Sequence, residues 1–152
     1  MSDCGRLIGA HLNIPFSATC FLEFKDCVEE SGIDIIGLTE TWLNDGSELM
    51  VRMEGSSFVC NNRATRGGGT DIYIRDGLRF DSIGFRLVLE NTSVVMKTND
   101  IKILFCVLYK PPGIGIRTLY ADIEDIVMAS LPVAVCVVVV LSPEFWFDVI
   151  GR

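Results

Sequence analysis

Apolar and polar residues alternate along much of the chain in short blocks, which is typical of strands with one covered face. The clearest block is Ile101–Tyr109, where every second residue is apolar. Lys110-Pro111-Pro112 ends this block, because proline cannot donate to a sheet ladder. We predict strands at His11–Ile14, Ile33–Leu38, Phe58–Asn61, Thr70–Arg75, Phe85–Glu90, Ser93–Thr98, Ile101–Tyr109 and Val133–Val140.

Two stretches have helical periodicity instead. A helix is predicted from Ser17, which can cap it, to about Ser31, with Gly32 as the residue that ends it. A second, amphipathic helix is predicted over Arg117–Leu131. Both helices fall between strands and no linker or repeat divides the 152 residues. The pattern therefore predicts one domain with a mixed α/β (α+β) layer structure.

Composition excludes several classes of protein. The hydrophobic fraction is 49%, and charged residues at 22% argue against disorder. The net charge of −7 predicts no strong general attraction to nucleic acid, which needs clustered Lys and Arg. The longest apolar run, Leu131–Leu141, is shorter than the ~20 residues that a membrane-spanning helix requires, so we expect no membrane segment.

The spacing of the cysteines bears on the cellular compartment in which the protein is expected. Six are scattered without a CxxC pair, and no apolar leader is recognisable in the first ten residues. We therefore expect reduced thiols in an intracellular protein, nuclear or cytoplasmic and not secreted.

Glu40 is the first candidate for chemistry. The stretch DIIGLTETWLN (Asp34–Asn44) is apolar until Thr39, so Glu40 lies where a buried strand ends. The carboxyl ends of strands are where α/β folds usually place ligands and metals. The simpler interpretation, that this acid caps a helix or lies in a solvated turn, stays open on the residues alone.

Four stretches together resemble one family, in family order. They are HLN (His11–Asn13), IDIIGLTETWL (Ile33–Leu43), RGGGTDIYIRDGL (Arg66–Leu78) and VLYKPPG (Val107–Gly113). The family is the endonuclease domain of non-LTR (LINE-type) retrotransposons, in the endonuclease/exonuclease/phosphatase superfamily. The resemblance implies a DNase-I-like fold, a four-layer α/β/β/α sandwich that is here partial and lacks its last strands. The resemblance covers about residues 10–140, so we expect a partial domain at 1–140 and a divergent tail at 141–152.

The resemblance also implies a magnesium-dependent phosphodiesterase that acts on DNA. Glu40 and the side-chain carbonyl of Asn13 would hold the Mg²⁺, since this hard cation prefers oxygen ligands. Tyr109 would place its hydroxyl near the scissile phosphate. From the residues alone, Tyr109 is a core residue by default, because it is in phase with the apolar face of its strand, although the double proline after it favours a strand end at a cleft. Asn13 is equally consistent with a plain turn.

Basic residues gather in one stretch around the glycine run. They are Arg63, Arg66, Arg75 and Arg79, which could contact the DNA backbone or simply lie on a solvated hairpin. Gly67–Gly69 precedes a strand and lacks a following Lys-Ser or Lys-Thr, so hairpin geometry is a better interpretation than a phosphate loop.

The resemblance breaks after the valine strand. The family has a Gly-Asp-Phe-Asn quartet there, but Ser142 and Glu144 stand in the places of its aspartate and asparagine. The family's Ser-Asp-His motif has no counterpart, and the single histidine, His11, is expected to be structural or solvent-facing. We therefore expect catalytic inactivity. An active phosphodiesterase that uses Glu40 with Glu144 or Asp148, and a non-catalytic interaction module, remain as alternatives.

Overall fold

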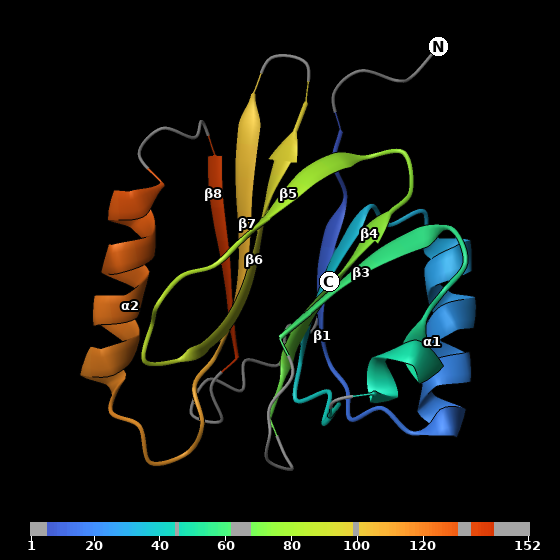
Figure 1. The fold of residues 1–152 in the computed structure, drawn as a ribbon, viewed down its shortest axis with the longest axis horizontal. Coiled ribbons are helices and arrows are strands. Elements are labelled where there is room, and N and C mark those ends of the chain that lie inside the picture. The colour runs from blue at the N-terminus through green and yellow to red at the C-terminus, as the bar shows by residue number, and fades with distance from the viewer. Residues whose placement is uncertain (1–5, 45, 62–67, 99–100, 131–134, 142–152) are drawn as a thin grey trace, which may run out of the picture.

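The computed structural model describes residues 6–44, 46–61, 68–98, 101–130 and 135–141, which form two four-stranded sheets and two α-helices (Figure 1). The elements are β1 (Gly9–Asn13), α1 (Ala18–Ser31), β2 (Ile35–Thr39), the 3₁₀ helix η1 (Ser47–Val51), β3 (Ser56–Asn61), β4 (Thr70–Arg75), β5 (Arg79–Ile83), β6 (Glu90–Lys97), β7 (Lys102–Tyr109), α2 (Ile116–Ala129) and β8 (Val135–Leu141). No helix in this part of the chain is long and apolar enough to cross a membrane.

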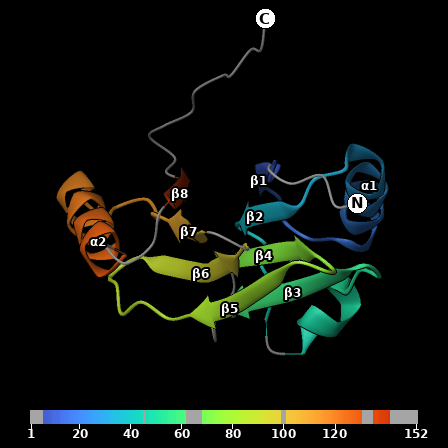
Figure 2. The same cartoon turned by 90° about the horizontal axis from the view of Figure 1, so that it is seen from above.

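The two sheets lie face to face, and each carries one helix on its outer side (Figure 2). The first sheet has the strand order β1-β2-β4-β3 and the second β5-β6-β7-β8. Helix α1 packs on the first sheet through Phe24, while Leu119 and Ile126 of α2 pack on the second. The layers therefore run α/β/β/α, which confirms the fold class expected from the resemblance to the DNase-I-like fold.

The core between the sheets brings β2 unusually close to β7. Ile35, Ile72 and Val107 are buried there with their neighbours on β6 and β7. A Cβ atom added to Gly37 would lie 2.6 Å from Cγ2 of Val107, so only glycine fits at this position of β2. The close approach matters for the site, because β2 and β7 both end where the candidate residues lie.

Both helix boundaries that the sequence indicated at α1 are confirmed. The Ser17 side chain accepts a hydrogen bond from the Cys20 backbone N–H, and Gly32 adopts φ 65°, in the left-handed region. The first two residues of the predicted Val133–Val140 strand lie outside the described residues, and the rest falls within β8.

The strand predicted over Phe85–Glu90 is wrong, and Ser93–Thr98 is only part of the longer β6. Residues 84–89 form a connection whose Phe85 and Leu87 pack against the α2 cluster. The buried Asp122 carboxylate of α2 accepts hydrogen bonds from the backbone N–H groups of Val88 (3.3 Å) and Leu89 (2.7 Å). These amides are satisfied by a side chain rather than by a neighbouring strand.

Strand β5 was not predicted. Only Phe80 and Ile83 are large and apolar among its five residues, and most of its side chains are exposed at the edge of the sheet. An exposed edge strand has little reason to alternate, so the periodicity that identifies buried strands is absent there.

Candidate functional site

The carboxyl ends of three strands meet at one end of the space between the sheets. Strands β1 and β2 are parallel, and Asn13 pairs with Thr39, the residue before Glu40. Asn13 lies on the same face of β1 as Gly9, whose added Cβ would contact Ile35 and Phe105, so this face points toward the second sheet. Tyr109 ends β7 on the face that carries Phe105 into the inter-sheet core.

The turn that follows β2 has an unusual backbone. Glu40 has φ 55° and Trp42 has φ 56°, values that non-glycine residues rarely adopt. Each such residue costs about 1–2 kcal/mol relative to an ordinary conformation. Two hydrogen bonds hold the turn, from Glu40 N to Gly69 O and from Trp42 N to Gly68 O, both 3.0 Å. Strained residues that the surroundings fix in this way cluster at functional sites.

Glu40 and Tyr109 meet directly, although 69 positions separate them in the chain. The Tyr109 hydroxyl donates to Oε1 of Glu40 at 2.7 Å. The tyrosine is only 6% exposed, and the glutamate is half-buried. The Tyr109 ring is therefore part of the core, as one interpretation of the sequence has it, while its hydroxyl contacts Glu40.

Asn13 offers a buried oxygen at the same end. Its Oδ1 atom is buried and makes no hydrogen bond within the described residues. A buried carbonyl oxygen without a donor is costly unless a cation or an ordered water binds it. The plain-turn interpretation gives this oxygen no role.

These donors fit a hard cation. A carboxylate and an amide oxygen suit Mg²⁺, which usually keeps several water ligands and needs few protein groups. No group of three or more His, Cys, Asp or Glu side chains suited to a metal gathers in the part of the chain that the structure describes. The two oxygen donors are therefore compatible with a water-rich Mg²⁺.

Below the turn lies a buried carboxyl group that the sequence analysis did not single out. Asp71 is 1% exposed, and Thr41 Oγ1 donates a hydrogen bond to its Oδ2. Burial raises the pKa of Asp71 to about 6, and the Thr41 hydrogen bond opposes this rise only in part. Thr41 lies between the two strained residues, so Asp71 helps to fix the turn that carries Glu40.

The remaining candidates are dispersed or lie outside the described residues. Arg75 forms an ion pair with Asp34 and lies at the far end of β4, because Thr70 is the residue of that strand that pairs with Thr39. Five residues of strand correspond to roughly 16 Å, so the structure does not bring Arg75 to Glu40. Residues outside the described ranges are Arg63, Arg66, Ser142, Glu144 and Asp148.

His11 has a local partner. Its Nε2 lies 3.1 Å from Thr39 Oγ1, and burial lowers its pKa. This contact agrees with the structural role expected for His11.

Glu90 is a second residue near the site that was not predicted. Its carboxylate accepts a hydrogen bond from Gly69 N at 2.8 Å. A signal for Asp71 existed, since it is an acid within TDIYI, an otherwise buried strand pattern. Glu90 carried no comparable signal, because an acid at the start of a strand usually faces solvent.

Comparisons with known proteins connect this geometry to a fold. No protein-family model and no curated protein matches the sequence. Among solved structures, the chain is similar to mannosyl-6-phosphatase Bt3783 of Bacteroides thetaiotaomicron VPI-5482, with TM-score 0.62, 14% identity and coverage of 87% of this chain and 62% of the other. It is similar to the endonuclease domain of TRAS1, a telomere-specific non-LTR retrotransposon, with TM-score 0.59, 14% identity and coverage of 82% and 54%.

A third similar structure is an endonuclease/exonuclease/phosphatase family protein from Bacteroides thetaiotaomicron, with TM-score 0.60, 14% identity and coverage of 87% and 59%. The chain thus spans between 54% and 62% of the length of these three structures. Likeness at this identity establishes architecture rather than activity. The chain has the DNase-I-like fold that these phosphatase and endonuclease structures share.

Proposed function

We propose that this chain is a domain of the magnesium-dependent DNA endonuclease kind found in non-LTR retrotransposons, which keeps the metal side of the site but does not cleave DNA by itself. The observation that carries this proposal is the 2.7 Å hydrogen bond between Tyr109 and Glu40, together with the unpartnered Oδ1 of Asn13 at the end of the neighbouring strand β1. A plain hydrophobic core would not explain why a strained glutamate, a tyrosine hydroxyl bonded to it and an amide oxygen without a partner all occur at the ends of β1, β2 and β7.

In this proposal, Glu40 and Asn13 hold a Mg²⁺ ion from one side. A Mg²⁺ ion held there would supply positive charge against the negative charge that builds up on the phosphate oxygens and on the leaving oxygen. In the unbound chain Tyr109 fixes the Glu40 carboxylate through its hydroxyl. Because this hydroxyl has a single proton, it would donate to a phosphate oxygen of the DNA only after leaving Glu40. The turn from Glu40 to Trp42 is fixed before any ligand arrives, which lowers the ordering cost of binding.

The proposed inactivity comes from the side of the site that handles the proton of the attacking water. A serine, Ser142, stands where the family has the aspartate of its quartet, and a serine hydroxyl is a poor proton acceptor near neutral pH. The single histidine, His11, is held by Thr39. Loss of a positioned general base typically lowers the rate by ~10²–10⁴.

A plasmid-nicking assay with Mg²⁺ tests this proposal, run together with a gel-shift assay on a short DNA duplex. We expect no nicking above background. We also expect weak Mg²⁺-dependent DNA binding that Glu40→Gln reduces and that Glu124→Gln, at an exposed site on α2, leaves unchanged. Mg²⁺-dependent nicking that Glu40→Gln abolishes would refute the inactivity and favour the alternative in which Glu144 or Asp148 completes the site. DNA binding that depends on neither Mg²⁺ nor Glu40 would refute the proposal that Glu40 holds a cation.

A further inference from the structure

Glu90 lies across from the candidate site on the second sheet. It begins β6 and pairs with Tyr109, the last residue of β7. Val94 and Met96, further along β6, belong to the inter-sheet core, so the alternation of the strand turns Glu90 toward the first sheet as well. Glu90 and Tyr109 therefore both face the Glu40 turn from the second sheet, and they pair with each other across β6 and β7.

The Glu90 carboxylate holds the glycine-rich segment. Its Oε2 accepts a hydrogen bond from the backbone N–H of Gly69 at 2.8 Å. Gly69 has φ 104°, and a Cβ atom there would lie 2.6 Å from Thr41 Oγ1, so the segment can approach the turn this closely only as glycine. A hydrogen bond to an ionised acceptor is shorter and stronger than a neutral one.

Gly69 connects Glu90 to Glu40 through its two backbone hydrogen bonds. Its carbonyl oxygen accepts the hydrogen bond from the Glu40 backbone N–H at 3.0 Å, while the Glu40 side chain accepts from Tyr109 at 2.7 Å. The connections form a closed ring: Glu90 to Gly69, Gly69 to Glu40, Glu40 to Tyr109, and Tyr109 back to Glu90 through strand pairing. The backbone and the side chain of Glu40 are thus both held from the same pair of strands.

We infer that Glu90 is a positioning residue for the cation site, which fixes the strained backbone of Glu40 through Gly69 so that its carboxylate points at the bound cation. This inference rests on the proposed function. Glu90 acts through Gly69 rather than by touching the cation. Groups that orient metal ligands from outside typically contribute 10–100-fold to metal affinity.

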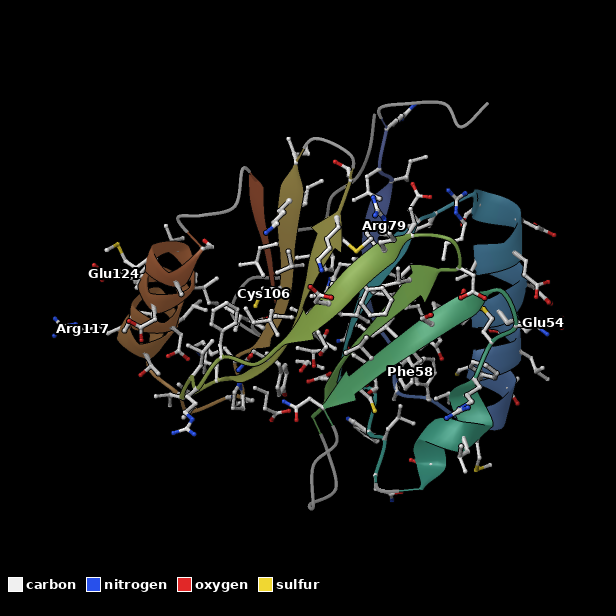
Figure 3. All side chains as sticks on the ribbon, turned by 45° about the horizontal axis from the view of Figure 1, so that its top comes forward. Glu54, Phe58, Arg79, Cys106, Arg117 and Glu124 are labelled. Atoms are coloured by element: carbon white, nitrogen blue, oxygen red, sulfur yellow. The ribbon has the colours of Figure 1, made fainter. Side chains whose placement is uncertain are left out.

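The test uses the full chain, labelled with ¹⁵N, and compares wild type with Glu90→Ala, Glu90→Gln and the control Glu124→Ala. Glu124 is exposed and projects from α2 away from the sheets (Figure 3). Proton–nitrogen correlation spectra report the amide resonances of Gly69 and Glu40, and titration with Mg²⁺ in the same spectra gives the affinity. Glu90→Gln is the conservative variant, because its amide oxygen can still accept the hydrogen bond from Gly69.

We expect Glu90→Ala to move both amide resonances and to weaken Mg²⁺ binding by about tenfold or more. In Glu90→Gln the two amide resonances and the Mg²⁺ affinity should stay close to those of the wild type. Glu124→Ala should change neither. Amide resonances that stay in place in Glu90→Ala would overturn the inference. Equal loss of affinity in Glu90→Gln and Glu90→Ala, with both amides unmoved, would also overturn it and make Glu90 a direct ligand. If the wild type binds no Mg²⁺, the proposed function fails, and the amide shifts still decide whether Glu90 places Glu40.

Discussion

Replacement of Asp71 by asparagine should change how the stability of the protein depends on pH. Burial raises the pKa of the Asp71 carboxyl from its ordinary value of 3.8 to about 6, so the folded state favours the neutral form. The stability that the neutral form contributes is fully present below pH 3.8 and is lost as the pH rises through about 6. Since one pH unit corresponds to about 1.4 kcal/mol per proton, the loss amounts to about 3 kcal/mol.

Asp71→Asn removes the titration and keeps an oxygen that can accept from the Thr41 hydroxyl. The variant should therefore gain stability relative to wild type by about 3 kcal/mol between about pH 4 and about pH 8. Burial lowers the pKa of His11, which gives a slope of opposite sign below pH 6.5. Both proteins contain His11, so its contribution cancels in the difference.

Urea unfolding at several pH values, followed by tryptophan fluorescence, measures this difference in the free energy of unfolding. Asp125→Asn, at an exposed site on α2, is the matched control for the loss of one carboxylate. A difference between Asp71→Asn and wild type that stays constant across this range would show that Asp71 is ionised throughout. The reasoning from its burial would then be wrong.

Three further predictions, which need four substitutions, test packing, backbone strain and hydrogen bonding in the fold. Gly37→Ala should destabilise the protein by about 1–3 kcal/mol in thermal unfolding, because its Cβ would meet Val107; an unchanged midpoint would mean that the sheets can separate freely. Glu40→Gly should be more stable than Glu40→Ala by about 1 kcal/mol, because glycine adopts φ 55° without strain; equal stabilities in urea unfolding would argue against a strained turn. Asp122→Ala should cost about 2–3 kcal/mol and speed hydrogen exchange at Leu89, since it removes the acceptor for that buried amide; unchanged exchange at Leu89 would contradict this role.

Regular patterns in the sequence were sufficient for both helices and most of the buried strands, whereas the order of the layers was expected from the family resemblance. Ser17 and Gly32 mark the ends of α1, and the alternation before Tyr109 marks β7, because capping and burial are local signals. The error at Phe85–Glu90 has a tertiary cause. An apolar segment can be covered by a helix without joining a sheet, and the buried Asp122 that satisfies its backbone lies more than thirty positions away.

The candidate site was predictable only in part. Glu40 and Tyr109 could be named from strand ends and from the family resemblance, and the structure brings them into contact. The contacts of Glu90 with Gly69 and Tyr109 depend on the register between strands and on the distance between the two sheets. Those quantities are set by long-range packing, and short motifs carry no information about them.

The central claim is that Glu40 and Asn13 form a site for a divalent cation. Titration of the full chain with Mn²⁺, followed by the electron paramagnetic resonance signal of the free ion, tests it most directly. We predict one site that Mg²⁺ competes for, with affinity reduced about tenfold or more by Glu40→Gln and by Asn13→Ala but not by Glu124→Gln. Binding that is absent, or that is equally strong after Glu40→Gln, would contradict the account.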